Sequence, residues 1–149
     1  MAGGVGSGEW NSYRKEMEIS TDYGVTFQPL PDMPAARDAG CLAIIDEKTI
    51  FIAGGHGPYP SGATGRLDDA YILNLETEQW TQKASVPGSD RTVQGVKAVE
   101  GWTGRDTCVV YESPSNGKEV YMFLGWDRNN VDVEVRIFNL ATEQWRSGK

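Results

Sequence analysis

The feature that most constrains this sequence is an internal repeat. Residues 74–80 (NLETEQW) recur 65 positions later as residues 139–145 (NLATEQW), with six of the seven positions identical. A weaker third copy aligns residues 27–34 with residues 80–87, which places an aromatic residue and a proline in register. Self-similarity of this kind is typical of repeat architectures, in which each unit buries its apolar face against a neighbouring unit.

Glycines mark the same place in each copy. Gly3-Gly4 and Gly54-Gly55 match each other, and Leu124-Gly125 stands there in the last copy. From the second glycine to the aromatic residue that closes the copy, the distances are 23, 25 and 20 residues. The unit is therefore constant and only its loops vary in length.

Each unit is predicted to contain four short β-strands, because apolar runs alternate with turn residues. The complete copy has such runs over 41–45, 49–53, 70–75 and 79–83. The last copy has them over 107–111, 120–124, 133–140 and 144–146, with Asn116-Gly117 as a hairpin turn. Eighteen glycines, seven prolines and 10% aromatic residues agree with a turn-rich, all-β protein.

Charge and hydropathy exclude several classes of partner. The 149 residues carry a formal charge of −7, and the sequence pI is about 4.7. Nucleic acids and anionic membranes attract a basic surface, so we expect neither as a partner. No apolar run approaches the roughly 20 residues that span a bilayer, and residues 1–8 lack the features of a signal peptide. The compartment stays open.

The spacing of several residue types resembles the kelch repeat. Arg37 precedes Gly55 by 18 residues, Asp68-Asp69-Ala70-Tyr71 follows, and Trp80 closes the unit. The last copy departs from this pattern, since it has Leu124-Gly125 in place of two glycines. The resemblance implies an all-β protein made of β-propeller blades, each of four antiparallel strands, as in the central domain of galactose oxidase.

A second resemblance lies in the first copy. Residues 20–27 (STDYGVTF) are similar to the Asp-box, S-x-D-x-G-x-T-aromatic, which is found on hairpins of sialidase-like propellers. Asp22 is expected to accept hydrogen bonds from the turn, and Gly24 to supply a positive φ. In that family the Asp-box is a structural hairpin, so it indicates a propeller and not a catalytic centre.

The repeats divide the chain into about two and a half blades. We expect the second half of a blade over 1–34, a complete blade over 35–87, and another blade with a long leading loop over 88–149. A closed ring needs roughly four to eight blades. The open blade faces would therefore need missing blades or self-association to cover them.

Several residues are expected to have structural roles. Arg37 would be buried against backbone carbonyls or carboxylates, because a guanidinium is a fork of five donors. The glycine pair would allow a close backbone approach, and aromatic residues would pack between blades. His56, the only histidine, is interpreted as an ordinary loop residue, and Cys41 and Cys108 as small buried apolar residues. The remaining structural positions are Gly54, Gly55, Tyr71, Trp80, Phe138, Trp145, Asp22 and Gly24.

The longest loops span residues 56–67, 88–104 and 126–131, and they are expected to emerge on one face of the blades. The kelch resemblance implies a protein-interaction scaffold acting through these loops rather than an enzyme, with no catalytic residue, metal or cofactor in this chain. The alternative is a fragment of a galactose-oxidase-like or sialidase-like enzyme whose catalytic residues lie outside this chain. The candidate binding residues are of the aromatic and arginine types that are enriched at binding hot spots: Tyr59, Arg66, Arg91, Trp102, Trp126 and Arg128.

Overall fold

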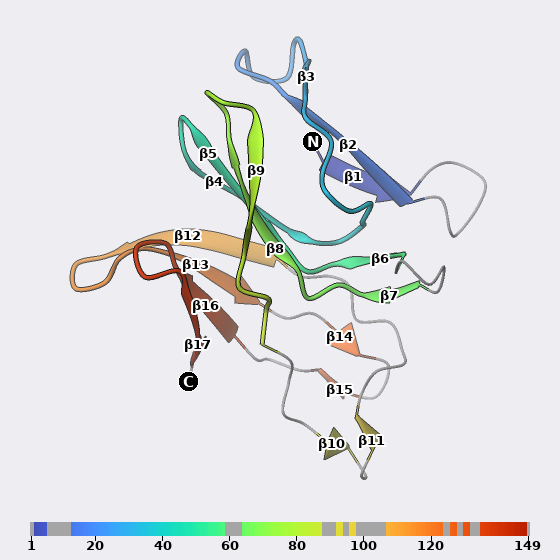
Figure 1. The fold of residues 1–149 in the computed structure, drawn as a ribbon, viewed down its shortest axis with the longest axis vertical. Coiled ribbons are helices and arrows are strands. Elements are labelled where there is room, and N and C mark those ends of the chain that lie inside the picture. The colour runs from blue at the N-terminus through green and yellow to red at the C-terminus, as the bar shows by residue number, and fades with distance from the viewer. Residues whose placement is uncertain are drawn as a thin grey trace.

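The computed structural model shows a chain built from β-strands joined by turns and loops (Figure 1). The described residues form three larger antiparallel sheets and three short two-stranded hairpins. In the described part of the chain there is no helix that could cross a membrane. The described residues are 2–5, 13–58, 64–87, 92–93, 96–97, 107–123, 126–127, 130–131 and 135–148.

Two of the larger sheets are four-stranded meanders, and they confirm the predicted all-β blades. The strands of the second sheet, in order, are β4 (Cys41–Asp46), β5 (Thr49–Ala53), β8 (Ala70–Asn74) and β9 (Gln79–Lys83). Those of the third sheet are β12 (Thr107–Ser113), β13 (Gly117–Phe123), β16 (Val135–Asn139) and β17 (Gln144–Gly148). All pairings in both sheets are antiparallel, as the hairpin turns in the sequence require.

The first sheet has three strands. They are β1 (Ala2–Val5), β2 (Tyr13–Ile19) and β3 (Gln28–Leu30), in that order. Ala2 pairs with Met17, as Ala53 at the end of β5 pairs with Ala70. Strand β1 therefore begins where the second strand of a four-stranded sheet would end.

The repeated heptad forms the tight turn between the last two strands of each four-stranded sheet. The Asn74 Oδ1 accepts hydrogen bonds from the backbone N–H groups of residues 76 and 77, at 2.9 and 3.0 Å. Asn139 does the same for residues 141 and 142, at 3.0 and 2.8 Å. Glu78 and Glu143 both adopt the left-handed conformation, with φ of 56° and 55°. The two copies of the repeated segment thus adopt one turn geometry, in which the asparagine side chain replaces a backbone acceptor.

The long loops predicted from the sequence contain three short hairpins, so they are not wholly irregular. His56 lies in a strand rather than in a loop, which corrects its interpretation as an ordinary loop residue. The hairpins are β6 (His56–Pro58) with β7 (Thr64–Arg66), β10 (Thr92–Val93) with β11 (Val96–Lys97), and β14 (Trp126–Asp127) with β15 (Asn130–Val131).

Each junction between sheets contains its own apolar core. The core between the first and second sheets includes Met17, Met33 and Leu73, with Trp80 packed against it. The core between the second and third sheets includes Phe51 and Phe138, whose ring centroids lie 5.2 Å apart. The aromatic residues of the repeat lie at these junctions, where their large apolar area stabilises sheet-to-sheet packing.

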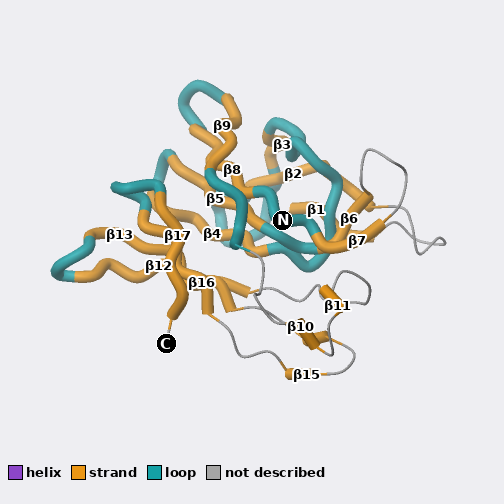
Figure 2. Tube along the Cα trace, turned by 60° about the horizontal axis from the view of Figure 1, so that its bottom comes forward, coloured by secondary structure: helices purple, strands orange, loops and turns teal. Residues whose placement is uncertain are grey.

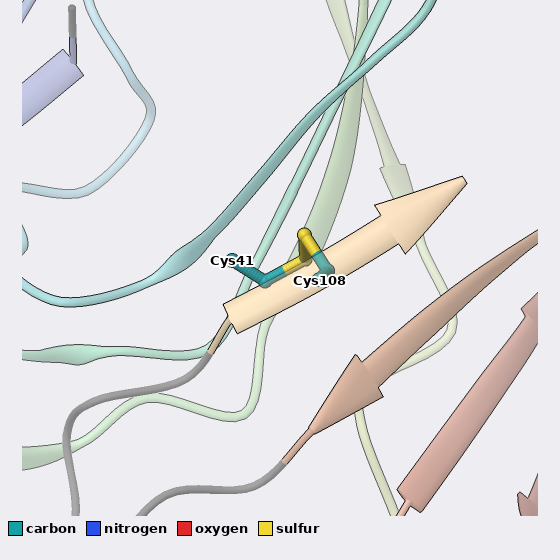
Figure 3. The surroundings of a disulfide bond; sticks show 2 residues. All are labelled: Cys41 and Cys108. Atoms are coloured by element: carbon teal, nitrogen blue, oxygen red, sulfur yellow. A yellow bond between two sulfur atoms is a disulfide. The ribbon is translucent and has the colours of Figure 1, made fainter.

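The two cysteines form a disulfide bond, which overturns the expectation that they are separate apolar residues (Figure 3). Their Cα atoms are 5.4 Å apart, on the first strands of the second and third sheets. In the second sheet, Cys41 pairs with Ala53. Phe123 holds the place of Ala53 in the third sheet, and it pairs with Thr107. Cys108 therefore lies one position further along its strand than Cys41 does.

This offset of one residue makes the bond possible. Successive side chains of a strand point to opposite faces of the sheet, so Cys41 points toward the third sheet and Cys108 points back toward the second. Matching positions would have placed both thiols on the same side of their respective sheets. The bond therefore joins neighbouring sheets through their first strands.

Reducing this disulfide should destabilise the pair of sheets that it joins. The bond closes a loop across a sequence separation of 67 residues. Chain entropy predicts a contribution of about 4 kcal/mol to the free energy of unfolding for such a loop. The C41S/C108S variant should lose a similar amount in urea unfolding monitored by tryptophan fluorescence. Quantitative alkylation of both thiols without a reductant would show that the bond is absent.

The turn between β2 and β3 is organised around Asp22. Its carboxylate accepts hydrogen bonds from the Thr26 N–H at 2.9 Å and the Thr26 hydroxyl at 2.7 Å. The Ser20 hydroxyl also donates to Asp22, at 2.8 Å, and accepts from the Gly24 N–H at 2.7 Å. Gly24 has φ of 85°, a conformation that glycine adopts without steric cost. The side chains of the Asp-box-like segment thus replace the backbone contacts that a two-residue turn would make.

These hydrogen bonds make the turn sensitive to acid. The Thr26 hydroxyl and N–H, followed by the Ser20 hydroxyl, lower the pKa of Asp22 to about 2. A depressed folded-state pKa stabilises the turn above the unfolded value near 4, and the contribution is lost as the pH falls through about 2. We expect Thr26→Val to raise the pKa of Asp22 toward its ordinary value of 3.8 in a carboxyl NMR titration. Thr21→Val, at an exposed neighbouring position, should leave the titration unchanged.

Candidate functional site

The three short hairpins lie on the same side of the chain. In Figure 1 they occupy the right and the bottom of the view, whereas the tight turns that join β4 to β5 and β12 to β13 lie toward the top and left. Figure 2, turned by 60°, shows the same separation. We call this end of the sheets the hairpin face.

Arg37 anchors the segment that leads into the second sheet, residues 35–40. Its side chain is only 2% exposed and donates two hydrogen bonds to the Asp69 carboxylate, at 2.7 and 2.8 Å. It also donates to the Gly54 carbonyl at 2.8 Å. A buried guanidinium is stable only when its charge is paired and its donors are used, and these contacts meet both needs. Arg37 thereby ties the leading segment to the ends of β5 and β8.

The leading segment then runs against β6 with almost no space between the backbones. Asp38 and His56 exchange two backbone hydrogen bonds, at 2.9 and 3.0 Å. A Cβ atom on Gly55 would stand 2.6 Å from the Asp38 carbonyl oxygen, and one on Gly57 would collide with the Ala36 carbonyl oxygen. Glycine at these two positions is what allows the approach.

A group of polar side chains sits above this contact, at the junction of the first two sheets. The Tyr13 hydroxyl lies 2.6 Å from Nδ1 of His56, and their ring centroids are 5.5 Å apart. Thr64 on β7 hydrogen-bonds to the Tyr13 hydroxyl, and the Asp38 carboxylate interacts electrostatically with both rings. Tyr13 comes from β2 of the first sheet, whereas Asp38, His56 and Thr64 belong to the second unit. We call these four residues the junction cluster.

Burial shapes the protonation of the junction cluster. Desolvation is the largest cause that raises the pKa of Tyr13, the Asp38 charge raises it further, and the Thr64 hydrogen bond lowers it. Desolvation also raises the pKa of Asp38. One carboxylate oxygen of Asp38 is inaccessible to solvent and accepts no hydrogen bond from the described residues. Tyr13 thus remains a neutral phenol that can donate to His56, beside a carboxylate whose hydrogen-bonding capacity is not used up.

The junction cluster was largely missed in the sequence. Tyr13 and Thr64 belong to no sequence motif. They lie on two segments that are remote in sequence, so only the fold brings them together. His56 directly follows the glycine pair, and Asp38 directly follows Arg37. The sequence assigns structural roles to those neighbours and no functional role to His56 or Asp38. The signal that was available is the single histidine beside a glycine pair.

Each of the six predicted binding residues belongs to one of the three long loops that contain the hairpins. The backbones of Arg66 and Trp126 lie in β7 and β14, and their side chains are outside the described residues. Across the described part of the chain, no group of three or more His, Cys, Asp or Glu side chains could hold a metal ion. The other four predicted residues lie outside the described residues: Tyr59, Arg91, Trp102 and Arg128.

Comparison with known proteins agrees with this architecture. Residues 39–87, which contain the whole second sheet, match the model of the Kelch motif. Among solved structures, 105 chains match this one. One of them, described as "Structure of YjhT", has a TM-score of 0.63 and 17% sequence identity, and the match covers 97% of this chain and 46% of that one. No curated protein matches the chain.

The fold is therefore that of β-propeller blades. The second sheet matches the Kelch motif, and the chain as a whole has the all-β fold of a partial propeller, as the sequence predicts. It spans less than half of the length of the YjhT structure.

The hydrogen bond between Tyr13 and His56 can be tested directly, because His56 is the only histidine. The contact with Tyr13 fixes the imidazole tautomer, because Nδ1 either accepts from the hydroxyl, which leaves the proton on Nε2, or donates its own proton to it. Tyr13→Phe should remove this preference in the ¹⁵N spectrum and lower the free energy of unfolding by about 1 kcal/mol. Tyr23→Phe is the matched control, because Tyr23 is fully exposed. An unchanged imidazole spectrum in Tyr13→Phe would rule out the interaction.

Proposed function

We propose that this chain acts as a protein-interaction scaffold, with the hairpin face as its binding surface. The observation that carries the proposal is the gathering of β6–β7, β10–β11 and β14–β15 on one side of the sheets (Figures 1 and 2). Loops held on a rigid scaffold commonly carry binding, since they can vary in sequence while the sheets hold them in place. Fold alone does not define a partner, so the argument rests on this surface.

The junction cluster supports the same surface. It adds polar groups to the hairpin face where the first and second sheets meet, and its residues are only partly buried. The proposed partner contacts are drawn from the same segments of the sequence: Tyr59, Arg66, Arg91, Trp102, Trp126 and Arg128. Side chains of these types contribute most of the binding free energy at many protein interfaces.

The proposal is tested by comparing the two ends of the sheets. The purified chain and its variants are used to capture partners by cross-linking, and the affinity for each partner identified is then measured by calorimetry. Arg66→Ala and Trp126→Ala should each weaken binding at least about tenfold, as expected for hot-spot residues.

The matched controls are Glu47→Ala and Glu112→Ala, which change exposed residues near the tight turns at the opposite end. We expect both to bind like the unmodified chain. Binding that is lost in these controls and kept in Arg66→Ala and Trp126→Ala would overturn the assignment of the face.

A second candidate function is a fragment of a propeller enzyme, and the Tyr13–His56 pair is the observation that favours it. A phenol and an imidazole in hydrogen-bond contact are groups that can transfer protons. The two functions separate in Tyr13→Phe. An enzyme of this kind shows turnover in the unmodified chain and loses it in Tyr13→Phe, whereas a scaffold shows turnover in neither.

A further inference from the structure

The negative charge of Asp38 is not paired within the described part of the chain. Among the described residues, no lysine or arginine forms an ion pair with it. Its neighbour Arg37 is committed to Asp69, and Arg14 on β2 pairs with Glu16 at 3.2 Å. One carboxylate oxygen of Asp38 is inaccessible to solvent and accepts no hydrogen bond from the same residues. The carboxylate therefore has the capacity to accept a cation.

Burial makes that unused capacity costly. A carboxylate withdrawn from water is stabilised by an opposite charge or by hydrogen bonds to its oxygens. Desolvation raises the pKa of Asp38, and it outweighs the lowering effects of His56 and of the Asp38 backbone N–H. A cation that bound beside Asp38 would offset the cost of desolvation, as Asp69 does for Arg37.

The carboxylate is held in place before any ligand arrives. Asp38 exchanges two backbone hydrogen bonds with His56, at 2.9 and 3.0 Å, and the close approach of Gly55 fixes the same segment. A site that is fixed in advance loses little conformational entropy on binding. Tyr13, Asp38 and His56 are each only partly buried, so a ligand can approach them from solvent.

Two aromatic rings stand beside the carboxylate. The ring centroids of Tyr13 and His56 lie 5.5 Å apart, and the ring planes are inclined at 47°. A guanidinium ion is planar, stacks on aromatic rings, and donates several N–H groups from its edge to a carboxylate. An ammonium ion is more strongly hydrated and has no plane to stack. The formal charge of −7 adds a long-range attraction for a basic partner.

We propose that the junction cluster binds the guanidinium group of an arginine side chain on a partner protein. The Asp38 carboxylate accepts its N–H donors, and the rings of Tyr13 and His56 flank its plane. This inference rests on the proposed function, which puts the partner on the hairpin face, and it names the chemistry that the partner presents there. Arginine is among the residues that are enriched at protein interfaces and at their hot spots.

Other ligand classes fit the cluster less well. An anion would lie beside the charge of Asp38 and be repelled by it. A metal ion needs several ligating side chains, and the described residues contain no group of three or more His, Cys, Asp or Glu that could supply them. The cluster therefore favours an organic cation.

The first test follows the imidazole signals of His56, the only histidine, by NMR. The purified chain is titrated with a capped tripeptide that has arginine between two glycines. The signals should shift saturably, with a Kd on the order of 1 mM for so small a probe. The matched peptide with citrulline, which is nearly the same shape but uncharged, should bind at least about tenfold more weakly. The absence of a saturable shift, or equal affinity for both peptides, would overturn the proposal.

A lysine peptide tests the choice of cation. It should bind more weakly than the arginine peptide, because an ammonium ion keeps its hydration and does not stack. Tighter binding of the lysine peptide would show that the cluster does not select a guanidinium group.

Two substitutions link binding to Asp38. Asp38→Asn keeps the shape and removes the charge, so it should weaken the arginine peptide at least about tenfold. Asp68→Asn changes an exposed aspartate shortly before β8 and should leave the affinity within about twofold. Asp38→Asn should also unfold at no lower temperature than the unmodified chain, because no ion pair is lost. Retained binding or a lower unfolding temperature in Asp38→Asn would contradict the proposal.

An arginine of the chain itself is the rival occupant. Arg66 on β7 pairs with His56 on β6 through the backbone. Arg66→Ala should leave the affinity for the arginine peptide within about twofold, since the peptide and not Arg66 occupies the site. Peptide binding that is seen only in Arg66→Ala would mean that Arg66 fills the cluster, and the proposal would be wrong.

The same variants separate this inference from the proposed function. Suppose that a captured partner is lost in Arg66→Ala and Trp126→Ala but the arginine peptide does not bind. The hairpin face then stands, and the arginine site fails. Peptide binding through Asp38, together with a partner unaffected by both hairpin substitutions, would instead overturn the hairpin face and keep the arginine site.

Discussion

The buried guanidinium of Arg37 is the interaction on which the described arrangement most depends. It joins the segment that leads into the second sheet to the ends of β5 and β8, so one side chain connects three parts of the chain. With this anchor in place, the leading segment runs close enough to β6 for the exchange of backbone hydrogen bonds between Asp38 and His56. That contact positions three parts of the structure, which are strand β4 after the leading segment, the β6–β7 hairpin and the junction cluster.

Much of the fold could be predicted because it depends on local chemistry that repeats. The heptad at 74–80 specifies a turn by an asparagine acceptor and a left-handed glutamate, and the same residues specify the same turn at 139–145. The disulfide could not be predicted in this way. It depends on an offset of one residue between two strands, and that offset is set by pairings across two sheets.

The candidate site was less accessible to sequence reasoning for a physical reason. Arg37 has an obvious task, since a charge near apolar strands must be paired. Tyr13, Asp38, His56 and Thr64 have no common spacing, because three segments from two units bring them together. The approach of Tyr13 to the other three residues depends on how the first and second sheets pack, which no single repeat encodes. The sequence predicts loops where the three short hairpins lie, because strands of two or three residues leave almost no periodic pattern.

The disulfide also makes the two junctions between sheets mechanically unequal. The second and third sheets are joined covalently through their first strands, whereas the first and second are held by an apolar core and the polar contacts of the junction cluster. A force or a ligand that changes the curvature of this arc therefore meets less resistance at the first junction.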